Sequence, residues 1–219
     1  MDAPELVRAP AAPPWNSEDT AGIAHRGRWL QYLTIGWNSA ECLVALVAGF
    51  LAGSIALVGF GFDSAIEVTS SLAALHRLGR ERDEACREAA ERRALRVIGA
   101  CFLLLAAYVA ADAIRSLVTG EEPRESVPGV ALAALSLVVM PVLAHFKRRV
   151  ASQLRSAALE AERRQTQICA YLSAILLAGL LLNATLGWWW ADPVAALAMT
   201  PLLVREGTEA WRGRTCCPE

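Results

Sequence analysis

Residues 59–71 read GFGFDSAIEVTSS, and they place two carboxylates, Asp63 and Glu67, in a run of otherwise apolar or small residues. A carboxylate near the middle of a bilayer costs about 2.5–3.5 kcal/mol even on lenient insertion scales, so it usually faces a bundle interior or water. Residues four apart lie on one side of a helix. Asp63 and Glu67 are therefore expected to face the same interior.

The rest of the chain is equally apolar. Of its 219 residues, 55% are hydrophobic, more than is usual for a soluble domain of this size. Six apolar blocks are each long enough to cross a hydrocarbon core of about 30 Å. They run from about Trp29 to Gly53, Ile55 to Leu78, Leu95 to Val118, Val127 to Phe146, Ile168 to Gly187, and Trp190 to Ala210. The sequence predicts an all-α, polytopic membrane protein with six transmembrane helices.

Basic residues are spread unevenly over the segments between these blocks. The N-terminal segment and the C-terminal end carry three each, and the second and fourth connections carry seven and six. The first and fifth connections carry none, and the third carries two. Lys147 is counted here as the start of the fourth connection. Because Lys and Arg accumulate on the cytoplasmic side, both termini are predicted to be cytoplasmic.

The segments outside the helices are short. Residues 1–27 are rich in Pro and Ala and lack the apolar core of a signal peptide, so we predict a disordered cytoplasmic tail. Residues 28–213 form the transmembrane domain, and residues 214–219 form a short cytoplasmic tail. The segment at residues 77–93, RLGRERDEACREAAERR, has opposite charges at helical spacing and predicts a cytoplasmic helical extension.

The six cysteines do not form a disulfide framework. Three of them, Cys42, Cys101 and Cys169, lie within predicted helices, and the others fall on the reducing side. The adjacent pair Cys216 and Cys217 could bind metal or be acylated, or could have no role.

A candidate cation site follows from depth in the membrane. Counted from the AGS hairpin at residues 52–54, Glu41 in the first helix is about as deep as Asp63 and Glu67. Asn38 lies one turn from Glu41 on the same face. Three carboxylates at one level repel one another unless protons or a cation neutralise them.

The fifth helix offers a second pair at i,i+4 spacing, Gln165 and Cys169, near its cytoplasmic end. Carboxylates combined with a thiolate suit a tetrahedral ion such as zinc. Taken alone, Cys169 could be a small packing residue, and Gln165 could cap the helix at the membrane interface.

Other polar residues have simpler explanations. Asp112 is followed at i+3 by Arg115, which predicts a local ion pair. Asp192 is predicted to cap the sixth helix, and Asn183 could bond across helices.

Two longer stretches carry a resemblance to a known family. They read AGSIALVGFGFDSAIEVTSSLAAL at residues 52–75 and GLLLNATLGWWWADPVAALAMTPLLVREGTEAW at residues 179–211. The first resembles the second helix of the cation diffusion facilitator transporters, where His or Asp is followed by Asp four residues later. Asp63 and Glu67 stand at these two ligand positions. The second is similar to the family's junction of the fifth and sixth helices, and the resemblance covers about Arg28 to Arg212.

The resemblance implies a divalent-cation exporter, commonly a proton-coupled homodimer that works by alternating access, with Zn²⁺ as the expected cargo. The family's fifth-helix ligands are a His and an Asp, and their positions fall near Gln165 and Cys169, where both are absent. The chain also lacks the usual cytoplasmic C-terminal metal-binding domain, and so resembles a small divergent branch. The expected metal ligands are Asp63, Glu67, Cys169, Gln165 and Glu41, with Asn38 as a secondary ligand.

The alternative is a metal sensor or scaffold that uses the same bundle without transport. An enzyme is not expected, because the chain has no Gly-x-Ser-x-Gly, His-Glu-x-x-His or glycine-rich phosphate loop. No prosthetic group is expected. The expected partners are a divalent cation, protons, the lipid bilayer and a second copy of the chain. Nucleic acid is not expected, since 21 basic residues nearly balance 22 acidic ones. The expected location is the inner membrane of a bacterium.

Overall fold

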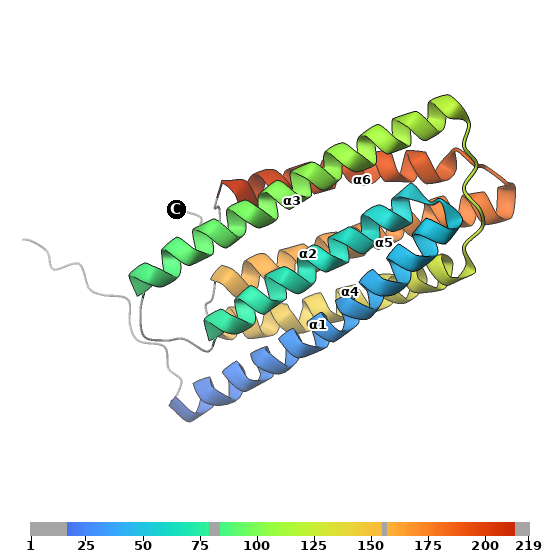
Figure 1. The fold of residues 1–219 in the computed structure, drawn as a ribbon. Coiled ribbons are helices and arrows are strands. Elements are labelled where there is room, and N and C mark those ends of the chain that lie inside the picture. Colours follow the sequence, from blue (N-terminus) through green and yellow to red (C-terminus); the bar gives the residue numbers. More distant parts are fainter. Residues whose placement is uncertain (1–16, 79–83, 155–156, 213–219) are drawn as a thin grey trace, which may run out of the picture.

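The computed structural model describes residues 17–78, 84–154 and 157–212, and these ranges fold into six helices without strands. The helices are α1 (Ser17–Ala52), α2 (Ile55–Leu78), α3 (Glu84–Thr119), α4 (Val127–Leu154), α5 (Ala157–Leu186) and α6 (Ala191–Trp211). Figure 1 shows an elongated bundle in which α1 begins and α6 ends at the same end. The all-α fold with six helices is confirmed.

Five of these helices, α1 to α5, are long and apolar enough to cross a membrane. Helix α6 is not among them, because any 18 consecutive residues of it contain at least three charged side chains, drawn from Asp192, Arg205, Glu206 and Glu209. Large apolar side chains on the outside of the bundle, such as Leu104, are exposed as expected for contact with lipid. The chain is a multi-pass membrane protein.

Helix α2 lies at the centre of the bundle. It contacts α1, α3, α5 and α6, while α4 packs against α1 and α5, and α3 packs against α6. The largest fully buried apolar side chains come from five different helices, and they are Leu57, Phe60, Val109, Met140, Leu172, Leu176, Met199 and Leu203. Side chains on α2 are therefore surrounded by protein on most sides.

A tight hairpin joins α1 to α2, as predicted from the AGS sequence. Gly53 has φ of 67°, a left-handed conformation that glycine adopts without steric cost. One turn earlier, a Cβ on Gly49 would lie 2.9 Å from the backbone nitrogen of Val58, so only glycine allows the two helices to approach this closely. The N–H of Arg124 donates to the carbonyl of Ala52 at 2.7 Å and satisfies the end of α1.

The starts of α1 and α3 can be compared with the predicted N-terminal tail and the predicted helical extension. Helix α1 begins at Ser17, so residues 17–27 are helical where the sequence predicted part of a disordered tail. Residues 1–16 lie outside the described ranges, as do Cys216 and Cys217. Helix α3 begins at Glu84 and runs without a break to Thr119, which confirms the helical extension for the residues described.

Gly99 and Gly207 allow α3 and α6 to cross closely. A Cβ on Gly99 would lie 2.6 Å from the backbone nitrogen of Trp211 and 2.7 Å from the carbonyl oxygen of Gly207. Because these are backbone atoms, they cannot move aside as a flexible side chain would. We expect Gly99→Ala to lower the free energy of unfolding by about 1–3 kcal/mol through overpacking. Thermal unfolding in detergent measures this loss.

Gly36→Ala is the matched control, because nothing lies within 4 Å of a Cβ at Gly36. Alanine favours a helix over glycine by up to about 1 kcal/mol, so this variant should be as stable as the wild type or more so. Equal melting temperatures for the two variants would contradict the close crossing at Gly99.

Candidate cation site

Buried polar side chains follow the inner faces of four helices. Within each helix they recur at spacings of about three, four or seven residues, or three full turns apart on α4, which places them on one face. All of them are 5% exposed or less. They are Gln31, Thr34, Asn38 and Glu41 on α1, Asp63, Ser64, Glu67 and Ser71 on α2, Ser136 and Lys147 on α4, and Thr166 and Ser173 on α5. The interior is therefore polar from mid-depth toward the end where α1 begins.

The three buried carboxylates lie at similar depths. At 1.5 Å per residue, Asp63 is about 12 Å and Glu67 about 18 Å along α2 from Ile55. Glu41 is about 16 Å along α1 from Ala52, the residue beside the same hairpin. In a hydrocarbon core of about 30 Å that starts near this hairpin, all three would lie in the middle part.

Asp63 meets the thiol of Cys169 where α2 packs against α5. The carboxyl group of Asp63 and the thiol of Cys169 interact, and the two residues are 5% and 1% exposed. The charge of Glu67 acts on Asp63, and so does that of Glu206 on α6. A carboxylate oxygen and a thiol sulfur are thus adjacent, close to the negative charges of Glu67 and Glu206. The part played by Glu206 was not foreseen from the sequence.

Glu67 is held by α4 and α5. Its Oε1 accepts a hydrogen bond from Thr166 Oγ1 at 2.6 Å, and it forms an ion pair with Lys147, whose Nζ lies at 4.0 Å. Lys147 Nζ also donates to Thr166 Oγ1 at 2.9 Å. The sequence counted Lys147 in the fourth connection, but it lies within α4, and its side chain is buried in the bundle.

Glu41 links three helices. Its Oε2 accepts a hydrogen bond from Ser64 on α2 at 2.9 Å, and its Oε1 accepts one from Ser136 on α4. Its charge interacts with those of Asp63 and Glu67. The charge of Glu41 therefore interacts with those of Asp63 and Glu67, and each of its two carboxylate oxygens accepts a hydrogen bond from a serine hydroxyl.

The two amide side chains among the expected ligands bond to residues other than the carboxylates. The Oε1 of Gln165 accepts a hydrogen bond from Ser70 on α2 at 2.7 Å, about one turn from Glu67. The Nδ2 of Asn38 donates to the carbonyl of Thr34 at 3.1 Å, and its buried Oδ1 has no hydrogen-bond partner among the described residues.

The expected ligands thus form adjoining pairs. In the described ranges, no group of three or more His, Cys, Asp or Glu side chains is arranged to hold a metal ion. The structure brings Asp63 to Cys169, and it brings Glu67 to Thr166 and Lys147. Glu41 and Gln165 lie in adjacent hydrogen-bond networks.

At the opposite end of the bundle, Asp192 fixes the start of α2. Its Oδ2 accepts hydrogen bonds from the N–H groups of Ile55 at 2.9 Å and Ala56 at 3.5 Å, and Ser54 Oγ donates to its Oδ1. The prediction that Asp192 caps α6 was wrong, because the N-cap of α6 is Trp190, without a side-chain hydrogen bond. The first N–H groups of a helix need acceptors, and a buried carboxylate supplies them here.

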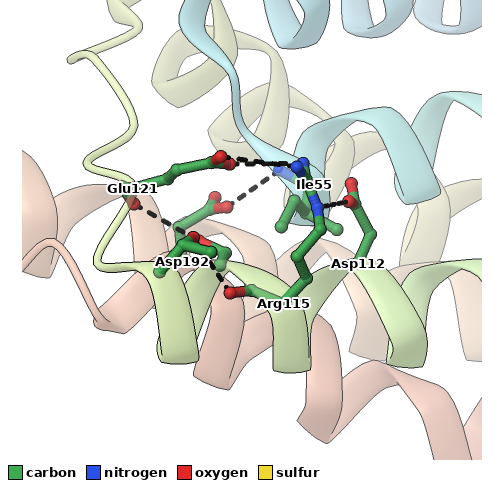
Figure 2. A network of polar contacts seen from close by, with 7 residues as sticks. Ile55, Asp112, Arg115, Glu121 and Asp192 are labelled. Atoms are coloured by element: carbon green, nitrogen blue, oxygen red, sulfur yellow. Dashed lines mark hydrogen bonds and ion pairs between the residues drawn. The ribbon is translucent and has the colours of Figure 1, made fainter.

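Figure 2 shows Asp192 beside Ile55, with Arg115 between Asp112 and Glu121. Arg115 pairs with Asp112 at 3.0 Å and with Glu121 at 3.2 Å, which confirms the predicted local ion pair. Asn183 Nδ2 donates to the carbonyl of Pro123 at 3.1 Å, so it ties α5 to the α3–α4 connection.

The membrane-length helices and the carboxylates at mid-depth define a class of protein. It is a polytopic membrane protein with an ionisable interior, the type of interior that marks ion pathways. The model of the cation efflux transmembrane domain matches residues 32–212. The chain therefore belongs to the cation efflux family, a family of divalent cation transporters, and the resemblance drawn from the sequence is confirmed. No curated protein matches the chain.

Proposed function

We propose that the protein exports Zn²⁺ in exchange for protons by alternating access. The observation that carries this proposal is the burial of Asp63 beside Cys169, with Glu67 one turn away on the same helix. Carboxylates in hydrocarbon require a positive partner, and a divalent cation or protons would supply it in turn. Asp63 and Cys169 are the proposed core of the site, with Glu67, Glu41 and Gln165 contributing when the cation is bound.

The choice of zinc rests on the donor atoms. A thiolate is a soft ligand that favours zinc or cadmium over magnesium, which prefers oxygen ligands alone. The Cys169 thiol must release its proton to bind a metal, so cation binding and proton release are coupled at this residue.

The side from which the cation reaches Asp63 is inferred from the buried side chains on either side of this residue. Between Asp63 and the hairpin at Gly53, the buried side chains of α2 include the large apolar Leu57 and Phe60. On the other side of Asp63, polar residues continue to Ser71. We propose that the cation enters from the polar side, which is the cytoplasmic side, and that release requires the helices to rearrange.

A metal sensor that does not transport is the second candidate. It is favoured by the contact of Lys147 with Glu67, because an internal cation already balances part of the negative charge. A sensor would bind zinc at Asp63 without moving it across the membrane. Homodimer formation and location in a bacterial inner membrane complete the proposal, and the mass of the protein in nanodiscs tests the former.

Flux in proteoliposomes separates the two functions. The purified chain is reconstituted, a proton gradient is imposed, and uptake of Zn²⁺, Cd²⁺, Co²⁺ and Mn²⁺ is followed in parallel. Gradient-dependent zinc movement is expected. Zinc binding measured by calorimetry without flux would favour the sensor, and neither binding nor flux would contradict both functions.

Replacing Cys169 tests the assignment of the metal. Cys169→Ser exchanges sulfur for oxygen and should weaken Zn²⁺ and Cd²⁺ binding by about 10–100-fold, with a smaller effect on Mn²⁺. Cys101→Ser is the matched control, since Cys101 is an exposed residue of α3. A uniform loss for all four ions would indicate a packing role for Cys169 instead.

A further inference from the structure

Lys147 lies inside the bundle although it is flanked by exposed residues. Its side chain is about 2–3% exposed, whereas Phe146 is 47% exposed and Arg148 is also exposed. In a helix the Cα–Cβ bond tilts toward the N-terminus. On α4 that direction leads away from the end where α1 begins and toward mid-depth. The side chain of Lys147 therefore extends into the interior, the reverse of a lysine that reaches for the membrane surface.

The contacts of the ammonium group include a hydroxyl oxygen and a carboxylate oxygen. Nζ donates to Thr166 Oγ1 at 2.9 Å and lies 4.0 Å from Glu67 Oε1, while Thr166 itself donates to Glu67 at 2.6 Å. Lys147 and Glu67 thus form an ion pair bridged by a hydroxyl. The ammonium balances Glu67 without occupying the shortest contact to that carboxylate.

The ion pair has a consequence for an empty transporter. When no cargo is present, a charged Glu67 still needs a positive partner if it is not protonated, since it is completely buried. A tethered ammonium supplies that charge at high effective concentration, because it cannot diffuse away. A monovalent ion from solution brings no more charge than the ammonium and has no tether. A divalent cation brings twice the charge.

We propose that Lys147 is a tethered cation that occupies Glu67 in the empty state and that only a divalent cation displaces it. Lys147 is then a specificity-determining residue, which sets the affinity for the cargo and excludes Na⁺ and K⁺. The proposal rests on the export function above, because it requires that Glu67 binds the cargo. Lys147 would then compete with the cargo for Glu67, a role that membership of the family does not give to any residue.

The test is calorimetric binding of ZnCl₂ to the full chain in nanodiscs. Lys147→Gln removes the competitor, so the variant is expected to bind Zn²⁺ more tightly by on the order of tenfold or more. Lys147→Arg keeps the charge, so its affinity should stay closer to that of the wild type than the affinity of Lys147→Gln does. Arg148→Gln removes the neighbouring exposed charge and serves as the matched control, with no change expected.

Two further arms exclude a merely structural role. In a Glu67→Gln background, Lys147→Gln is expected to change the affinity by less than about twofold, because the carboxylate for which the two cations compete is gone. Replacing choline chloride with NaCl should weaken zinc binding to Lys147→Gln and leave the wild type unchanged. If Lys147→Gln does not fold, Lys147→Met, which is neutral and of similar length, is measured with the same expectation.

The outcomes separate this proposal from the export function. Wild-type binding with equal or weaker affinity in Lys147→Gln would overturn the role of Lys147 and leave the exporter intact. A gain of affinity that persists in the Glu67→Gln background would also overturn it. Absence of zinc binding in both the wild type and Lys147→Gln would overturn the export function, and the competition with it.

Discussion

Asp63→Asn is expected to lower gradient-driven zinc flux by at least about 100-fold, because it removes a proposed direct ligand of the cation. Loss of the residues that only orient a ligand already costs metal sites about 10–100-fold. The substitution preserves shape and removes only the charge. The amide oxygen that it introduces is a weaker zinc ligand than a carboxylate, and the amide carries no proton between the two sides of the membrane. Both steps of the proposed exchange therefore fail together.

The same substitution should leave the fold intact. Asp63 is buried, and the like charges of Glu67 and Glu206 act on it, so an uncharged amide relieves repulsion. The melting temperature in detergent is expected to equal or exceed that of the wild type. This combination of lost flux and retained stability distinguishes a functional residue from a structural one.

Asp112→Asn is the matched control for flux, since Asp112 pairs with Arg115 near the other end of the bundle. Its flux should equal that of the wild type. If Asp63→Asn transports zinc at the wild-type rate, the cation does not pass through Asp63, and the proposed site is in the wrong place.

Much of the site could be predicted from sequence because burial of charge is costly. Asp63 and Glu67 stand out within an apolar block, and their spacing alone places them on one helix face. Glu41 could be assigned to the same depth by counting from the hairpin. What the sequence does not contain is the local partner of each group, such as the hydroxyls of Ser64 and Ser136 that hold Glu41.

Lys147 was misassigned because the rule for basic residues counts charges near helix ends without regard to direction. A signal was present. Lys147 lies eleven residues after the buried Ser136, which is about three turns, and so it falls on the same inner face of α4. The Cα–Cβ bond tilts toward the N-terminus of α4, so the side chain extends toward mid-depth. Its partners on α2 and α5 still depend on tertiary packing.

Asp192 illustrates the limit of local rules. An aspartate in the first turn of a helix ordinarily satisfies the N–H groups of that helix, which led to the expectation of a cap for α6. The acceptor is instead used by Ser54 and Ile55, more than 130 residues earlier in the chain. Only the packing of α6 against α2 brings these groups together.

Asp192→Ala is accordingly expected to destabilise the protein by about 3 kcal/mol, since it leaves buried donors at the start of α2 without an acceptor. Asp192 is 1% exposed, so water cannot readily replace the carboxylate. Ser54 Oγ, which donates to Asp192, also accepts from the N–H of Leu57 at 3.1 Å, and the loss should extend to this contact. Thermal unfolding in detergent measures the effect.

The matched control is Asp112→Ala, in which an exposed ion pair with Arg115 is lost at a cost of about 0–1 kcal/mol. A loss in Asp192→Ala no larger than in this control would contradict the cap of α2. The position of Asp63 depends on where α2 begins. Asp192→Ala should therefore reduce both the stability and the zinc flux of the protein that remains folded. Asp63→Asn should reduce the flux without lowering the stability. This difference distinguishes a residue that positions the site from a residue of the site.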